Sequence, residues 1–234
     1  MNRLLAFGLT VCCAASNLNA DVLVTNDSEW RYLHLEDGKD PAEGDKEFHS
    51  TFMKADFDDA EWKKGKDRPG KKYGFGYGTA GSEDFEGISL AMKEPKTNDE
   101  GQSIDAPAAY FRLKFTSKED FDTFVFKCQR DDAIIVYIDG EEVLRDNLPK
   151  GEDRIDLYAS ETISGDGETK VNKFPVRKKL KAGEHLLAIS LHNREGTSSD
   201  LRIAEISLEA VDEKELEKLK DDTEGEEADE DDLF

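Results

Sequence analysis

Residues 130–149 read RDDAIIVYIDGEEVLRDNLP, and this stretch decides the fold. The run from Ala133 to Ile138 is apolar and rich in β-branched side chains, which predicts a strand covered on both faces. Asp139-Gly140 follows it directly. Because a type I′ turn needs positive φ at both central positions, this pair predicts a tight hairpin into a second strand over 142–145. The stretch therefore predicts antiparallel β-structure, whatever the function.

Apolar runs on either side predict further short strands, over residues 109–115, 123–128, 185–192 and 201–211. The last run changes phase at Ala204-Glu205, which predicts a β-bulge. Cys128 lies in an alternating apolar run and is expected to be a buried, unreactive thiol. Because polar, glycine-containing loops and little helix separate the strands, we expect an all-β, two-sheet antiparallel β-sandwich.

The N-terminus has the pattern of a signal peptide. Arg3 is the only charge before Asp21, and residues 4–15 form a short apolar run. We expect cleavage after Ala20 and export to the periplasm or the extracellular space. A lipoprotein is less favoured, because Val11 is large for the position before a lipidated Cys12.

The chain is strongly acidic, with 54 Asp and Glu against 32 Lys and Arg, a net charge of −22. Such a chain repels nucleic acids and anionic lipids, so neither is an expected partner. No run after the signal peptide is long and apolar enough to span a bilayer. We expect three parts: the signal peptide over 1–20, the sandwich over 21–211, and an acidic tail over 212–234 with a short helix followed by disorder.

Several short motifs occur in one order, at residues 30–33, 57–62, 73–78, 110–112, 131–149, 191–193 and 198–201. That order resembles the galactose-binding-domain-like jelly-roll module of secreted bacterial proteins. This accessory module often accompanies phosphoesterase or other hydrolase domains, and is similar to the sugar-binding domain of family 2 glycoside hydrolases. The resemblance covers roughly residues 28–210 and implies jelly-roll topology, with carbohydrate or a glycosylated surface as ligand. The fold alone does not imply sugar binding.

Under this resemblance, polar side chains at loop ends and nearby aromatic faces are expected to bind the ligand. The residues are Asp131, Asp132, Arg145, Asn147, His192, Asn193, Asp200, Trp62 and Tyr77. For Asp132, His192 and Asp200 we favour an alternative, in which they form a buried hydrogen-bond network that pins loops together. The aromatic residues of 73–78 have an alternative role as a cover over the core.

The resemblance also implies a structural calcium ion near the turn after the first strand. Asp37 and Asp40 flank Gly38 there, and Glu205 in the last strand would close the site. A solvated turn is the alternative.

Catalysis is not expected. Asp131 and Asp132 are adjacent, so within a strand they would point to opposite faces and make a poor glycosidase pair. The histidines lack metal-type spacing, and there is no Gly-x-Ser-x-Gly motif. We expect an exported, non-catalytic module that binds carbohydrate. The alternatives are a calcium-stabilised structural or protein-interaction module of the cell envelope, and a hydrolase with an unrecognised site.

Overall fold

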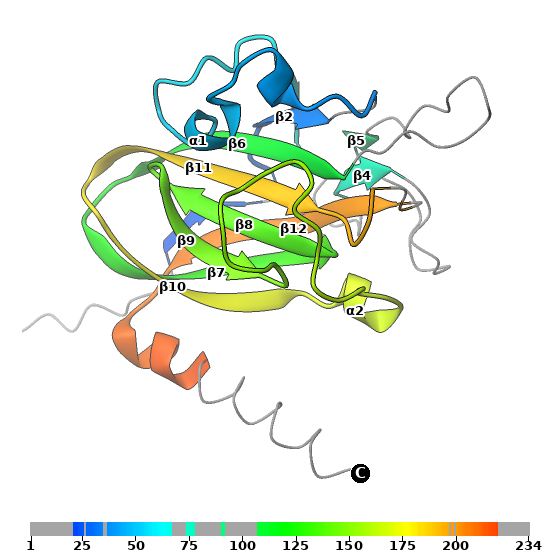
Figure 1. Cartoon of the computed structure of the whole chain (residues 1–234). Helices are drawn as coiled ribbons and strands as arrows, with labels where there is room; N and C mark the ends of the chain where they lie inside the picture. Colours follow the sequence, from blue (N-terminus) through cyan, green and yellow to red (C-terminus); the bar gives the residue numbers. More distant parts are fainter. Residues whose placement is uncertain are drawn as a thin grey trace, which may run out of the picture.

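A computed structural model describes residues 21–25, 27–34, 37–66, 74–77, 90–91, 107–196, 198 and 200–219. Two sheets of the described chain pack face to face in a β-sandwich (Figure 1). This confirms the fold predicted from the sequence. The expected signal peptide and most of the acidic tail lie outside the described residues.

Each sheet has six strands, and every described pairing is antiparallel except that of β4 with β5. Sheet A has the order β10-β7-β12-β4-β5, with β1 also paired to β12. Its strands are β1 (Asp21–Val24), β4 (Phe75–Tyr77), β5 (Leu90–Ala91), β7 (Phe121–Asp131), β10 (Asn172–Leu180) and β12 (Leu201–Ala210). Sheet B has the order β3-β2-β6-β11-β8-β9. Its strands are β2 (Trp30–His34), β3 (Lys63–Gly65), β6 (Ala108–Ser117), β8 (Ala133–Ile138), β9 (Glu141–Asp146) and β11 (Gly183–His192).

From β6 onward the chain passes back and forth between the sheets, with only the β8–β9 hairpin staying in one of them. This alternation is the predicted jelly-roll topology. The helices are short: η1 (Pro41–Glu43), α1 (Phe48–Thr51), α2 (Asp166–Thr169) and a helix over 213–219. The last of these is the helix expected at the start of the acidic tail. None of the described helices has the length and apolar character needed to cross a membrane.

Two local predictions hold in detail. Asp139 and Gly140 both have positive φ, 52° and 82°, as the hairpin turn between β8 and β9 requires. The pairing of β12 with β7 shifts register between Ala204 and Ser207, and Glu205 has a φ of 51°, which is the expected bulge. Strand β10 was not predicted.

The main core lies between the sheets. Phe111 on β6 faces inward from sheet B, while Phe124, Phe126 and Cys128 on β7 face inward from sheet A. Cys128 is fully buried, and burial raises the pKa of its thiol well above the ordinary value. The predicted burial of Cys128 is therefore confirmed, and a raised pKa agrees with the expected low reactivity.

A second apolar cluster lies on the outer face of sheet B, under the segment that carries η1 and α1 (Figure 1). Phe48 and Phe52 of this segment pack on Tyr110 of β6, with ring centroids 4.9 and 5.0 Å apart. Trp62 also belongs here: it is half-buried, and its ring lies 5.7 Å from that of Phe57. The segment therefore covers the outer face of sheet B.

Arg112 on β6 links the segment that carries η1 and α1 to sheet B. Its side chain is 1% exposed, and its Nε donates to Asp59 Oδ2 at 2.7 Å. The guanidinium also donates to the carbonyl oxygens of Phe52 and Lys54, the latter at 3.0 Å. A buried guanidinium needs this degree of pairing, because an unpaired one carries a large desolvation cost.

Replacing Arg112 should destabilise the fold strongly. We expect Arg112→Ala to lower the free energy of unfolding by about 3 kcal/mol, because it removes the partner of Asp59 Oδ2 and of buried carbonyl groups. The measurement is urea-induced unfolding. The matched control is Arg154→Ala, which removes an ion pair with Asp156 whose side chains are 59% and 62% exposed. The control should stay within about 0.5 kcal/mol of wild type. Equal losses in the two variants would show that Arg112 does not anchor the cover.

Candidate functional site

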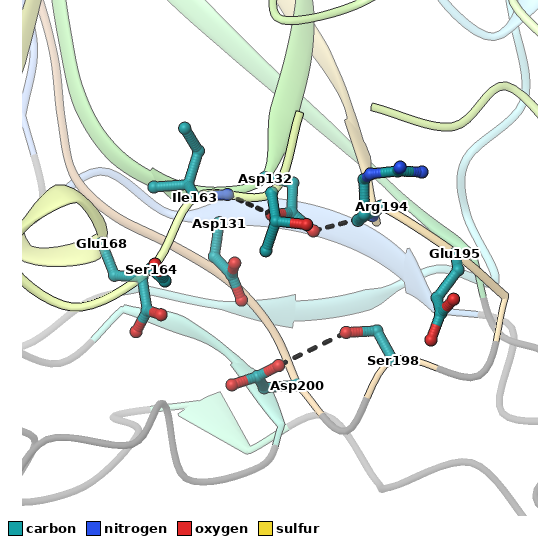
Figure 2. Close-up of a pocket in the computed structure, with 10 residues that line it drawn as sticks. Asp131, Asp132, Ile163, Ser164, Glu168, Arg194, Glu195, Ser198 and Asp200 are labelled. Atoms are coloured by element: carbon teal, nitrogen blue, oxygen red, sulfur yellow. Dashed lines mark hydrogen bonds between the residues drawn. The ribbon is translucent and has the colours of Figure 1, made fainter. Parts of the chain in front are cut away.

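The candidate site is built around the point where the chain crosses between sheets. β7 ends at Asp131 in sheet A and β8 begins at Ala133 in sheet B, so Asp132 alone links the two strands. Asp132 is 2% exposed, and its Oδ1 accepts the backbone N–H of Ile163 at 2.8 Å. Its Oδ2 accepts the backbone N–H of Arg194 at 2.7 Å (Figure 2). Asp132 therefore pins two loops, the role that the sequence analysis favoured.

These two loops and the sheet crossing enclose a polar pocket of about 400 Å³. Five carboxyl groups and three hydroxyl groups line it, with a single arginine. The lining residues are Asp131, Asp132, Thr162, Ile163, Ser164, Glu168, Arg194, Glu195, Ser198 and Asp200. The pocket is therefore rich in hydrogen-bond acceptors and strongly acidic.

Asp131 is the least satisfied group in this pocket. Its side chain is 5% exposed, and its buried Oδ2 accepts no hydrogen bond. Figure 2 shows its carboxyl group directed into the space bordered by Glu168 and Asp200. Burial, followed by the negative charges of Asp132 and Asp200, raises the pKa of Asp131 to about 8. Asp131 is therefore mainly protonated at neutral pH, and one of its buried oxygens has no hydrogen-bond partner within the described chain.

The two adjacent aspartates do not point to opposite faces, contrary to expectation. Both line the same pocket (Figure 2). The alternation of side chains holds only within a strand, and Asp132 lies between two strands of different sheets. The peptide bond between the two residues is cis.

His192 does not reach the pocket. It is fully buried on β11, with Nε2 3.2 Å from Asp153 Oδ1, and the hydroxyl group of Tyr137 donates to Asp153 Oδ2 at 3.1 Å. Burial alone would raise the pKa of Asp153, but its contacts with His192, Ser190 and Tyr137 together outweigh burial and lower it. His192 is thus part of a buried polar cluster separate from Asp132. Asp200 belongs to the pocket, so the expected single network of Asp132, His192 and Asp200 is not formed.

Arg145 and Asn147 also hold loops rather than the pocket. Arg145 pairs with Glu142 at 2.7 Å and donates to the carbonyl oxygens of Pro149 and Gly151. The Asn147 side chain donates to the carbonyl oxygen of Asp132 at 3.0 Å, and it also bonds to the backbone of residue 161. Neither residue is among the lining of this pocket, so a ligand role for Arg145 and Asn147 stays a prediction.

The predicted aromatic face is not formed by Tyr77 and Trp62. Tyr77 is 2% exposed in the main core, and its hydroxyl group accepts a hydrogen bond from Asn193 Nδ2 at 3.1 Å. Asn193 is fully buried, so it too acts inside the fold. Trp62 packs in the second cluster and is not part of the pocket lining. Their aromatic surface serves packing; Tyr73 lies outside the described residues.

The three predicted calcium ligands do not form one site. Asp40 Oδ1 accepts the N–H of Ala42 and contacts His49 Nε2, both at 2.8 Å. Asp37 Oδ1 accepts the N–H of Lys39 at 3.3 Å, and Glu205 lies at the bulge of β12. Across the described part of the chain, no three His, Cys, Asp or Glu side chains are grouped so as to hold a metal ion. Calcium binding itself stays a prediction.

Sequence analysis found Asp131, Asp132 and Asp200 but missed Glu168 and Glu195. Glu168 lies in α2 and Glu195 follows β11, both in loop regions without apolar periodicity. In a chain with 54 acidic residues, two more glutamates in loops carry no separate signal. Only the folded loops bring them to the pocket.

No protein-family model matches the chain, and no curated protein matches it. Among solved structures, Bacteroides uniformis beta-glucuronidase 2, covalently bound to cyclophellitol-6-carboxylate aziridine, is similar at 13% identity and a TM-score of 0.44. The match covers 82% of this chain and 18% of that enzyme. A family 2 glycosyl hydrolase from Bacteroides cellulosilyticus matches at 12% identity and a TM-score of 0.41, over 81% of this chain and 20% of the enzyme.

A family 35 carbohydrate-binding module from Clostridium thermocellum is also similar, at 7% identity and a TM-score of 0.27. That match covers 44% of this chain and 70% of the module. These are the kinds of protein that the sequence resemblance names. The likeness concerns the fold alone, and the chain spans a fifth or less of the length of the two glycosidases. Function is therefore inferred from the pocket itself.

Replacement by Asn should affect the stability of the fold differently at Asp131 and at Asp132. Asp132→Asn should lower the free energy of unfolding by about 2 kcal/mol, because an amide cannot accept both backbone N–H groups. Asp131→Asn should leave stability unchanged or raise it, because an amide of the same shape is neutral without taking up a proton, whereas the raised pKa makes the folded chain protonate Asp131 at neutral pH. Urea-induced unfolding at neutral pH measures both. A larger loss for Asp131→Asn than for Asp132→Asn would contradict the two assigned roles.

Asp131 should also make the fold less stable as the pH rises. Its pKa is about 8 in the folded chain against an ordinary 3.8, so between these values the folded state holds a proton that the unfolded state has lost. The free energy of unfolding then falls with pH by about 1 kcal/mol per unit from this group. Unfolding curves across that range should show a shallower fall for Asp131→Asn than for wild type. Parallel curves would place the Asp131 pKa near its ordinary value.

Proposed function

We propose that this protein is an exported, non-catalytic binding module whose acidic pocket takes a carbohydrate or a glycosylated surface. The observation that supports this is the pocket of about 400 Å³ in which Asp131 Oδ2 is buried and accepts no hydrogen bond. A buried acceptor without a partner is costly unless a ligand satisfies it. The volume lies in the range of small-molecule sites and suits a sugar unit.

The chemistry of the lining agrees with a sugar ligand. Sugar hydroxyl groups both donate and accept hydrogen bonds, and the pocket offers carboxyl groups beside the hydroxyl groups of Thr162, Ser164 and Ser198. Its described lining contains no aromatic ring. Recognition would therefore rest on hydrogen bonds to one or a few units rather than on stacking along a polysaccharide chain.

A hydrolase is the second candidate, and one observation favours it. Asp131 carries a proton at neutral pH beside other carboxyl groups, and a protonated and an ionised carboxyl group form the usual glycosidase pair. Binding ranks first because Asp132, the neighbour in sequence, already uses both carboxylate oxygens to hold backbone N–H groups. Release of nitrophenol from a panel of aryl glycosides would favour the second candidate.

The binding proposal is tested by calorimetric titration of the full chain with a panel of oligosaccharides, with calcium and then with chelator. We expect at least one sugar to bind, and Asp200→Ala to weaken it about tenfold through loss of a charged hydrogen-bond acceptor. Trp62→Ala is the control and should bind like wild type, because Trp62 packs in the second cluster.

If no sugar binds, either with calcium or with chelator, the proposed function is wrong. Stabilisation of the fold by calcium in that case would favour the structural or protein-interaction alternative, since a ligand that binds only the folded state raises its stability. Binding that Trp62→Ala abolishes in a folded variant would move the site to the outer face of sheet B.

A further inference from the structure

The pocket holds far more negative than positive charge. Its lining has five carboxyl groups and one arginine, Arg194. Arg194 is exposed, and Figure 2 shows its guanidinium directed away from the carboxyl groups. Among the lining residues that the structure describes, this arginine does not offset the negative charge of the carboxyl groups.

The carboxyl groups act on one another. Besides burial, the charges of Asp132, Asp200 and Glu168 all raise the pKa of Asp131, and Arg202 only partly offsets them. Burial and then the charge of Asp200 also raise the pKa of Glu168. A positive charge placed among these groups would relieve the repulsion and favour their ionised forms.

The arrangement suits an organic cation better than a metal ion. Metal ions need several ligands grouped around one point, and no such group occurs among the residues that the structure describes. An ammonium group has three N–H donors and needs no fixed coordination geometry. Asp131 is 5% exposed, its carboxyl group is directed into the pocket, and its buried Oδ2 has no hydrogen-bond partner, so an ammonium group in the pocket would lie beside an unsatisfied acceptor (Figure 2).

We propose that the pocket selects a sugar that carries a free ammonium group, such as a hexosamine without its N-acetyl group, over neutral and acidic sugars. This inference rests on the proposed carbohydrate-binding function and specifies its ligand. The ammonium group donates to the Asp131 carboxylate, and Glu168 and Asp200 supply further negative charge. Charge-assisted hydrogen bonds of this kind are about twice as strong as neutral ones.

Acidic sugars are excluded by the same charges. A uronic acid would bring a further carboxylate into a pocket that already has five carboxyl groups. An N-acetylated hexosamine would keep its shape at the ring but lose its charge and two of its three N–H donors. The order of affinity should therefore be free amine, then neutral and N-acetylated sugars, then uronic acids.

The test is calorimetric titration of the full chain at mildly acidic pH with four oligosaccharides of equal length. These are a glucosamine oligomer, its N-acetylated counterpart, a neutral glucose oligomer and a galacturonic acid oligomer. We expect the N-acetylated and neutral oligomers to bind at least about tenfold more weakly than the free amine. Added salt should weaken only the binding of the amine.

Matched variants locate the effect. Asp131→Asn and Glu168→Gln should each reduce affinity for the glucosamine oligomer about tenfold, while changing affinity for the neutral oligomer far less. The control is Glu119→Gln, an exposed acidic residue at the opposite end of β7. It should bind like wild type. Thermal unfolding of each variant checks that the fold is intact.

The outcomes separate this inference from the function on which it rests. Equal binding of the amine and its N-acetylated counterpart, or tighter binding of a neutral or acidic oligomer, would overturn the amine preference and leave carbohydrate binding in place. No binding to any of the four would overturn the amine preference, and the wider sugar panel described above would then decide the proposed function. Spermidine is the non-sugar probe: if it bound as tightly as the glucosamine oligomer, the pocket would be a general cation site and the sugar part of the inference would be wrong.

Discussion

The two hydrogen bonds that Asp132 accepts from backbone N–H groups are the constraint on which the candidate site depends. Asp132 is the single residue between a strand of sheet A and a strand of sheet B, so it occupies the one place from which both loops are within reach. Its carboxylate takes the N–H of Ile163 and that of Arg194, and its carbonyl oxygen takes the Asn147 side chain. Backbone donors in buried loops need such partners. With three separate loop segments held at one residue, the pocket has fixed walls although it is made of loops.

The parts of the fold that follow from local physics were predictable. The strand β8 and its hairpin come from an apolar run and an Asp-Gly pair, and both act over a few residues. Strand β10 was not predictable in this way: only Val176 and Leu180 of it are buried, and its lysines suit an edge strand but give no period of two. Nor does a strand pattern state to which sheet a strand belongs. The crossing at Asp132, and with it the shared orientation of the two aspartates, is therefore a property of the folded chain.

A sequence pattern also does not state which side chains the fold buries. This explains why the structure places several predicted site residues away from the pocket. Alternating aromatic and glycine residues around Tyr77 predict a ligand platform and a core strand equally well, and burial decides between them. The main core and the outer cluster of sheet B together take up the aromatic side chains Tyr77 and Trp62 that were expected to bind sugar. The described lining of the pocket consists mainly of carboxyl and hydroxyl groups. The burial of these aromatic side chains in the two clusters therefore limits how the pocket could bind a ligand. Because its described lining has no aromatic ring, it would have to use hydrogen bonds and charge.

Asp131 and Asp132 are adjacent in sequence, but Asp132 holds the fold together while Asp131 is a candidate for contact with a ligand. Asp132 gives its oxygens to the fold, and a buried carboxylate with two N–H donors is well satisfied. Asp131 has a buried oxygen with no hydrogen-bond partner, and its raised pKa shows that the folded chain disfavours its charge. An asparagine there would keep the shape and would not have to take up a proton on folding at neutral pH. A residue that costs stability and leaves a buried oxygen without a hydrogen bond is best explained by a contact outside the fold. Among the possible ligands, one that brings a positive charge removes the cost directly, because it favours the ionised form of Asp131 that the surrounding carboxyl groups oppose.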